Sequence, residues 1–211
     1  MLEIRKSSCR LAFLSKSDGS VKLKHGQTSV VAAVNGPLDV KIIKEQVDKM
    51  NVDIIFKYKT ESKAKNQRTM EKLIQQICEC SVLVKNFPRT NLTIALQELE
   101  DDGSLLACCI NATCLALLDA CIPMKQLFAA VSVCFNKVDD TITIDPTLSQ
   151  ESQYPGVTFV FNNGKFNVIA MHSNSFLSKE VLNKSLLQAR EHAKLMFDSY
   201  RDLIKQSHQI V

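Results

Sequence analysis

The sequence contains no tryptophan, and aromatic residues make up only 6% of its 211 positions, so the core is predicted to be mainly aliphatic. Six glycines and five prolines are too few for a collagen-like or low-complexity chain. The net charge is small, at +4, while 45% of residues are apolar. This balance excludes an intrinsically disordered chain, and the length allows one large domain or two small ones.

Long hydrophobic runs are also scarce. The longest, residues 105–118, is interrupted by Asn111 and Thr113 and falls short of the roughly 20 residues that a bilayer span requires. The opening residues Met1–Lys6 include no apolar signal region. We therefore expect a soluble, intracellular protein with no membrane partner.

The cysteines lack the spacing of a zinc site, because none of the eight forms a CxxC pair. Seven of them fall in segments that are otherwise typical of a core: Cys78, Cys80, Cys108, Cys109, Cys114, Cys121 and Cys134. Without a signal peptide, we expect reduced, buried thiols that act as small hydrophobic residues, and not a disulfide framework.

Positive charge is concentrated near the N-terminus. Residues 1–72 hold 15 Lys+Arg and 8 Asp+Glu, whereas residues 73–211 hold 11 and 14. The densest basic stretch comprises Lys57, Lys59, Lys63, Lys65 and Arg68, opposed only by Glu61. Two interpretations stay open: a solvated loop, or a contact to a nucleic-acid backbone, because clustered cations gain affinity by releasing condensed counterions.

Alternating apolar residues predict a series of β-strands. They cover residues 8–15, 21–23, 29–34, 52–58, 91–99, 127–135, 141–144, 157–161 and 166–172. Helical periodicity predicts a helix from about Leu73 that ends at Pro88, and an amphipathic helix after Ser178. Residues 105–121 are apolar nearly all round, which indicates a buried helix. This order predicts an α+β fold with mixed sheets and helices between them.

Several short motifs, in their order along the chain, resemble those of RNase PH domains. They are Asp18-Gly19-Ser20, Gly26-Gln27-Thr28-Ser29-Val30, Gly36-Pro37, Phe87-Pro88-Arg89-Thr90, Asp102-Gly103-Ser104, Asn111-Ala112, Ala116-Leu117-Leu118-Asp119-Ala120 and Ile122-Pro123-Met124. The segments 103–109, 144–147 and 150–151 resemble core subunits of the eukaryotic RNA exosome, of the type called component five. Relatives of that type are also named cell-death-related nucleases. The resemblance covers roughly residues 8–205.

The resemblance implies a fold and a set of partners. The fold would be RNase PH-like (ribosomal protein S5 domain 2-like), with duplicated βαβα halves, mixed sheets and central helices in one domain over residues 1–211. Such domains pair through their sheets, and the pairs form six-membered rings that RNA threads. The implied partners are other RNase PH-like exosome subunits and RNA, in the nucleus, including the nucleolus, and the cytoplasm.

The resemblance also implies that the phosphorolytic site is degenerate. Where active relatives present a Gly-Ser/Thr-Arg turn to phosphate, this chain has Gly103-Ser104-Leu105. An aspartate expected about twelve residues after Asp145 is replaced by Val157, with Thr158 beside it. An arginine expected before the first helix aligns with Met70, two residues from Arg68. We therefore predict no phosphorolysis, no catalytic residues, no bound metal and no cofactor.

Two acids remain as weak catalytic candidates. We expect Asp145 to cap the turn before Pro146 and Glu151 to be solvated. The alternative is a residual metal-dependent hydrolytic site that uses both carboxylates. The histidines, His25 in an expected turn, His172, His192 and His208, are far apart in sequence and indicate no Ser-His-Asp arrangement.

Two functions follow from the resemblance. The first is a non-catalytic RNA-binding subunit of the exosome ring that supports 3′-to-5′ RNA processing and degradation. Its expected RNA-binding residues are Lys57, Lys63, Lys65, Gln67, Arg68 and Arg89, although Arg89 could instead form a structural ion pair. The second is a homodimeric nuclease, or a nucleic-acid-binding cofactor, in apoptotic DNA degradation. A homodimer is expected for the isolated chain, because unpartnered ring faces would pair with each other.

Overall fold

A computed structural model describes residues 5, 7–40, 45–60, 66–136 and 141–208. Residues 206–208 are described by their backbone alone. The first sheet contains β1 (Ser7–Leu11), β2 (Gly19–His25), β3 (Thr28–Asp39), β4 (Asn51–Lys57) and β5 (Thr90–Glu100). Its spatial order is β1-β2-β3-β5-β4. Only the β4–β5 pair is parallel among the paired strands of the described residues.

The second sheet has four antiparallel strands in the order β7-β6-β8-β9. They are β6 (Phe128–Asn136), β7 (Thr141–Ile144), β8 (Gly156–Asn162) and β9 (Val168–Ser173). The helices are α1 (Gln67–Ser81), the single turn η3 (Val84–Asn86), α2 (Leu105–Asp119), α3 (Leu148–Gln153) and α4 (Lys179–His208). No helix among the described residues is both long and apolar enough to cross a membrane.

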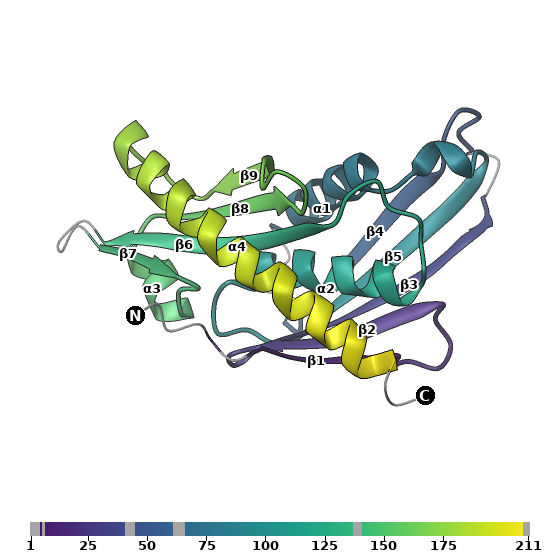
Figure 1. The fold of residues 1–211 in the computed structure, drawn as a ribbon, viewed down its shortest axis with the longest axis horizontal. Helices are drawn as coiled ribbons and strands as arrows, with labels where there is room; N and C mark the ends of the chain where they lie inside the picture. Colours follow the sequence, from purple (N-terminus) through teal and green to yellow (C-terminus); the bar gives the residue numbers. More distant parts are fainter. Residues whose placement is uncertain (1–4, 6, 41–44, 61–65, 137–140, 209–211) are drawn as a thin grey trace.

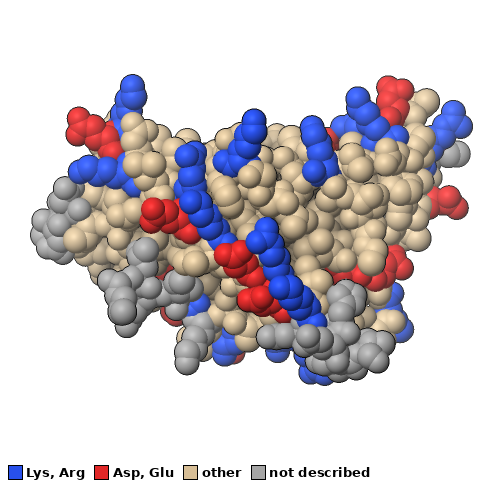
Figure 2. Space-filling view, in the orientation of Figure 1, with Lys and Arg blue, Asp and Glu red and all other residues tan. Residues whose placement is uncertain are grey.

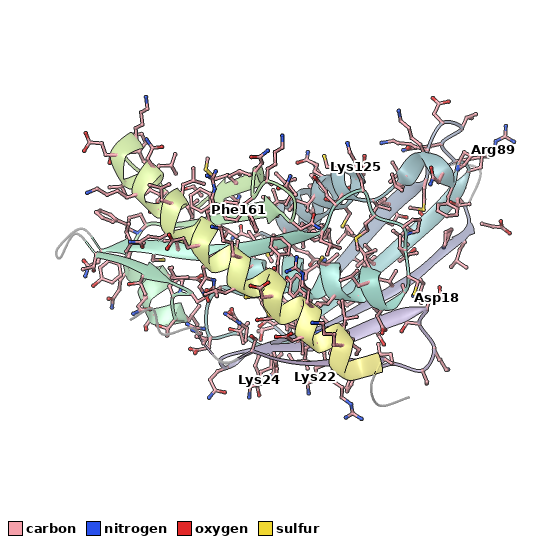
Figure 3. All side chains as sticks on the ribbon, in the orientation of Figure 1. Asp18, Lys22, Lys24, Arg89, Lys125 and Phe161 are labelled. Atoms are coloured by element: carbon pink, nitrogen blue, oxygen red, sulfur yellow. The ribbon has the colours of Figure 1, made fainter. Side chains whose placement is uncertain are left out.

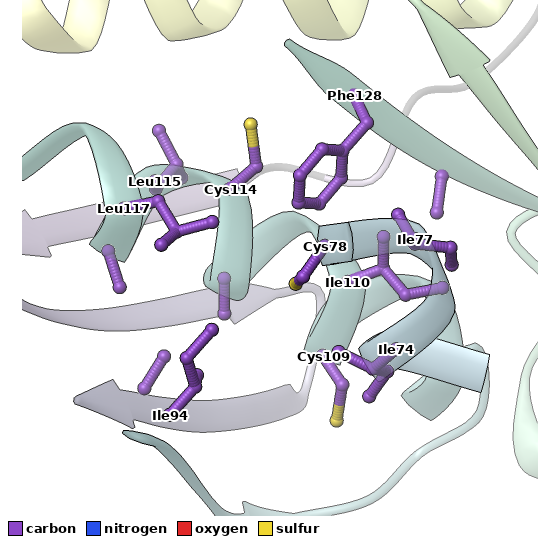
Figure 4. Close-up of a cluster of buried hydrophobic side chains, with 14 of the residues drawn as sticks. Ile74, Ile77, Cys78, Ile94, Cys109, Ile110, Cys114, Leu115, Leu117 and Phe128 are labelled. Atoms are coloured by element: carbon purple, nitrogen blue, oxygen red, sulfur yellow. The ribbon is translucent and has the colours of Figure 1, made fainter. Parts of the chain in front are cut away.

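The central element is α2, which packs against β2 and β3 of the first sheet and β6 of the second. Eleven consecutive residues of α2, Ala107–Leu117, are buried, as the all-apolar pattern predicts. The long helix α4 runs diagonally over the molecule and contacts β6 and β8 (Figure 1). Figure 4 shows how α1, α2 and β6 contribute to one core through side chains such as Ile77, Ile110 and Phe128.

Several boundaries differ from the sequence predictions. The first helix ends at Ser81 and not at Pro88, because the chain turns at Val82 to bridge Met124. Strand β3 continues past Gly36 to Asp39 through an irregular register with β5. The short helix α3 was not predicted, although Gln150 forms half of a capping box by accepting a hydrogen bond from the backbone N–H of Thr147.

The prediction of buried cysteines is confirmed for five residues: Cys78, Cys108, Cys109, Cys114 and Cys134. It is wrong for Cys80 and Cys121, which are exposed. Cys80 lies on the solvent side of α1, and Cys121 follows the last turn of α2, so neither continues the buried face of its helix. All eight thiols are free.

Candidate functional site

A cleft of about 590 Å³ opens beside the N-terminus of α2. Its lining comes from the β4–α1 and β5–α2 connections, from the helices α1, α2 and α3, and from the strands β6, β8 and β9 with the residue after β9. The lining residues are Tyr58, Asn66, Thr69, Met70, Asp101, Leu105, Leu106, Ser132, Leu148, Glu151, Thr158, His172 and Asn174. Two of the positions at which the family resemblance implies a lost functional group, Met70 and Leu105, therefore line one cleft. The third predicted position, Val157, does not line it, but its neighbour Thr158 does.

The Gly103-Ser104 turn, where the resemblance implies a phosphate site, has a left-handed backbone. Gly103 and Ser104 have positive φ angles of 95° and 55°, and a Cβ at Gly103 would lie only 2.6 Å from the backbone nitrogen of Leu148. Glycine is therefore required where the turn meets the β7–α3 connection. The Ser104 hydroxyl donates to the Pro146 carbonyl at 3.2 Å, and the Leu105 side chain lines the cleft where a guanidinium would be needed.

A carboxylate of the chain itself lies at this helix N-terminus. Glu151 Oε1 accepts a 2.8 Å hydrogen bond from the backbone N–H of Ser104, the residue before α2. The partial positive charge of a helix N-terminus favours such an anion. The expectation of a solvated Glu151 is therefore wrong: the side chain is half-buried and holds α3 to α2.

The other two substituted positions carry neutral groups. Met70 Sδ accepts a 3.0 Å hydrogen bond from the Tyr58 hydroxyl, whose pKa is raised by burial first and then by the nearby Cys109, Glu98 and Asp101. Thr158 Oγ1 lies 2.9 Å from Ser132 Oγ.

The side chains of β8 alternate between two environments. Thr158 lines the cleft, whereas Val157 is buried in the core beneath α4. A carboxylate would therefore have to stand at position 158, and not at 157, to face the cleft. His172 pairs with Thr158 across β8 and β9 and also lines the cleft, which the sequence did not indicate.

The charge of the cleft opposes phosphate. Among the described lining residues there are two carboxylates, Asp101 and Glu151, and neither lysine nor arginine. In the described part of the chain, no three His, Cys, Asp or Glu side chains are grouped so that they could hold a metal ion. The described lining therefore presents hydroxyls, amides, carboxylates and the His172 imidazole to a ligand, but no lysine or arginine that could bind a phosphate oxygen.

Two of the predicted basic residues adjoin residues that line the cleft: Lys57 precedes Tyr58, and Arg68 precedes Thr69. Lys57 ends β4 and is exposed, and Arg68 is exposed in the first turn of α1. The Gln67 amide donates to Glu71 Oε1 at 3.0 Å. Lys63 and Lys65 lie outside the described residues. On the face that carries α4, by contrast, Lys and Arg side chains are interspersed with Asp and Glu and form no continuous basic patch (Figure 2).

Arg89 lies apart from these residues. It precedes β5, whereas the Gly103-Ser104 turn follows it, and 11 strand residues at about 3.3 Å each separate the two by roughly 30 Å or more. Figure 3 shows Arg89 at one end of the molecule. Its backbone has a φ of 60°, and its exposed Nε lies 3.5 Å from Glu45 Oε1. Of the two roles considered for Arg89, RNA binding and a structural ion pair, the structure contains the ion pair, with Glu45.

Asp145 does not cap a turn. Its carboxylate is buried, with Oδ2 at 2.9 Å from His25 Nε2 and 3.6 Å from His192 Nε2. His25, expected in a turn, is the last residue of β2. Asp145 and Glu151 therefore face different environments, which separates the two acids of the weak hydrolytic candidate. His25 and His192 lie 120 and 47 positions from Asp145 in the sequence and meet it only through the tertiary fold. No sequence motif therefore indicated this cluster.

Comparison with known proteins places the chain in a family. The sequence pattern of the 3′ exoribonuclease family, domain 1, matches residues 3–123. The chain belongs to the RNase PH family. It is 30% identical over 206 residues to the exosome complex component RRP46 homolog of Caenorhabditis elegans, covering 96% of this chain and 94% of that protein.

Solved structures confirm the predicted RNase PH-like α+β fold. The crystal structure of rice (Oryza sativa) Rrp46 superposes with a TM-score of 0.87 at 27% identity, covering 94% of both chains. An archaeal exosome core chain superposes with a TM-score of 0.81 at 18% identity, covering 94% of this chain and 87% of its own, which shows a shared fold.

Proposed function

We propose that this chain is a structural, RNA-binding subunit of an exosome ring that does not cut RNA. The family membership and the similarity to RRP46-type exosome components support a place beside other RNase PH-like subunits. We further propose that it is of the component five type and acts as one domain. We expect it in the nucleus, including the nucleolus, and the cytoplasm, in RNA processing such as that of ribosomal RNA.

One observation carries the proposal of an inactive site. Leu105, Met70 and Thr158 line the same cleft, and the described lining includes two carboxylates but no basic residue. Loss of a single oxyanion ligand commonly reduces the rate by about 10² to 10³. Because the described lining offers phosphate no lysine or arginine and Glu151 lies at the helix N-terminus, we expect no measurable phosphorolysis.

The RNA contacts are proposed beside the cleft. Lys57 and Arg68 are exposed, and Lys63 and Lys65 lie in the segment between them. Gln67 would contribute through its amide, although that amide already donates to Glu71. Arg89 belongs to a second, distant contact, since it sits at the other end of β5.

We do not carry forward the apoptotic nuclease, with DNA as its substrate. Asp145 is buried and Glu151 binds the start of α2, so neither the site nor the relatives favour that function. The homodimer stays a proposal for the isolated chain, and light scattering on purified protein tests it. A monomer at micromolar concentration would contradict it.

The test of RNA binding is a charge reversal with a matched control. Lys57→Glu with Arg68→Glu should weaken binding to single-stranded RNA and reduce the slope of log affinity against log salt by about 0.7 for each lost contact. Lys179→Glu with Lys205→Glu makes the same charge change on α4, where both side chains are exposed, and should leave the slope unchanged. Equal effects of both pairs would contradict a local RNA site.

A further inference from the structure

Three buried side chains from distant elements meet in the interior of the protein. His25 ends β2, Asp145 follows β7, and His192 lies in the middle of α4. His25 is 6% exposed, Asp145 7% and His192 2%. Both histidines approach the same carboxylate oxygen, Asp145 Oδ2, at 2.9 Å and 3.6 Å. The described part of the chain thus contains a buried cluster of two imidazoles on one carboxylate.

The single carboxylate of this cluster cannot balance the charge of two protonated histidines. One carboxylate compensates one imidazolium, so a second protonated histidine would leave a net positive charge in the interior. Both ring nitrogens of His192 lack a hydrogen-bond partner in the described structure, whereas Asp145 Oδ2 has a close ion-pair contact with His25 Nε2. The 3.6 Å separation from His192 is longer than a hydrogen bond, whereas His25 is at contact distance. His192 is therefore the imidazole that is held neutral.

The groups packed around His192 reinforce this assignment. Burial lowers the pKa of His192, the Asp145 carboxylate opposes this shift, and His25 adds to it. On α2, Cys108 interacts with the Asp145 carboxylate: its pKa is raised to about 12 by burial first, then by Asp145 and Asp101, so the thiol stays neutral. On α4 itself, Arg190 lies two residues before His192, and its Nε is buried without a hydrogen-bond partner. Its guanidinium is positive and therefore cannot balance a charge on His192.

The position of His192 along α4 gives the cluster a mechanical consequence. The preceding half of the helix packs on the second sheet through Leu186 and Ala189. The following half packs on the main core through Met196, Phe197 and Tyr200, which are nearly fully buried. His192 lies at the junction, so a charge placed there acts on the docking of both halves.

We propose that the His25–Asp145–His192 cluster is a proton-sensitive latch that keeps α4 docked on the two sheets. At neutral pH His192 is uncharged and α4 stays in place. Acidification protonates His192, and because Asp145 is already engaged by His25, the buried positive charge releases α4 before the first sheet unfolds. This inference is independent of the proposed function.

The sign of the effect follows from linkage. A histidine whose pKa is lower in the folded state stabilises the docked helix above about pH 6.5, the unfolded value, and loses that contribution as the pH falls toward the folded value. Opening of α4 should therefore become up to about tenfold more populated for each pH unit in that window.

Hydrogen exchange on the full chain tests the latch. After correction for intrinsic exchange rates, α4 peptides should exchange up to about fivefold faster at pH 5.5 than at pH 6.5, while β3 and β5 keep their protection. His192→Leu should abolish the acceleration. His25→Gln keeps His192 in place, frees Asp145 to balance its charge, and should weaken the acceleration.

The matched control is His172→Gln, since His172 lines the cleft outside the cluster and its variant should keep the wild-type response. The latch is wrong if wild-type α4 shows no acid acceleration beyond that of β3 and β5. It is equally wrong if the acceleration persists at full size in both His192→Leu and His25→Gln.

Discussion

The carboxylate of Glu151 accepts a 2.8 Å hydrogen bond from the backbone N–H of Ser104 and so places a negative charge at the start of α2. In this family the same helix terminus is the implied phosphate site, and here the chain contributes its own anion to it. The contact also joins α3 to α2, the central helix of the fold. It therefore has a structural role besides its effect on ligand charge.

Removing this contact should destabilise the protein. Glu151→Ala deletes both the acceptor and the charge at a helix N-terminus, which should lower the free energy of unfolding by about 1 kcal/mol. Glu151→Gln keeps an acceptor and should have a smaller effect. Urea titration measures both against Ser152→Ala, an exposed hydroxyl on the same helix. A Glu151→Ala effect no larger than that of the control would show that the contact contributes nothing.

Gly19 should be the least replaceable glycine of β2 and its turn. A Cβ there would overlap the backbone nitrogen of Ala120 and lie 2.6 Å from the Ala116 carbonyl oxygen, where β2 meets the end of α2. Because backbone atoms cannot yield, Gly19→Ala should lower the free energy of unfolding by about 2 to 3 kcal/mol. Gly164→Ala, with nothing within 4 Å of its Cβ, should be neutral in the same thermal or chemical unfolding experiment.

Thiol labelling of native protein should separate the cysteines by exposure. Cys80 and Cys121 are exposed and should react rapidly with a maleimide or iodoacetamide. Cys9 should react more slowly, because burial and then Asp119 raise its pKa to about 11. At pH 8 that shift makes the thiolate about 100-fold scarcer than for a thiol with a pKa near 9. The five buried thiols should label only on unfolding, and rapid labelling of more than three would contradict the core.

Restoring one lost group should separate binding from turnover. Leu105→Arg would place a guanidinium in the cleft and should increase affinity for inorganic phosphate, measured by calorimetry. It should not produce turnover, because Thr158 still supplies no carboxylate and Met70 no cation. Leu106→Arg is the matched control, since Leu106 lines the same cleft one position along. Turnover by Leu105→Arg alone would show that the other two losses are unimportant.

The sequence predicted the elements whose pattern is local. The all-apolar stretch of α2 and the stripe of α4 each specify a buried surface, and both helices occur where the patterns lie. The short helix α3 was missed because six residues are too few to show a helical period. The end of α1 was predicted too late because Val82 leaves the helix to form a β-bridge with Met124, which is a tertiary contact.

In the candidate site, too, local motifs were predictable from the sequence, whereas contacts between distant elements were not. The substitutions at Met70 and Leu105 were found from motifs, and the structure brings both into one cleft. The position of the expected aspartate was assigned to Val157, with Thr158 beside it. In a β-strand, neighbouring side chains point to opposite faces, and here Val157 faces the core whereas Thr158 lines the cleft. The environments of Asp145 and His192 depend on contacts between distant elements, which spacing in the sequence does not encode.

The most direct test of the central claim is phosphorolysis by the purified protein. Single-stranded RNA with a free 3′ end is incubated with inorganic phosphate and magnesium, and release of nucleoside diphosphates is followed beside an active RNase PH enzyme. We predict that this chain binds the RNA yet releases no nucleoside diphosphate above the rate of a protein-free control. Phosphate-dependent release at a rate comparable to that of the active enzyme would contradict it.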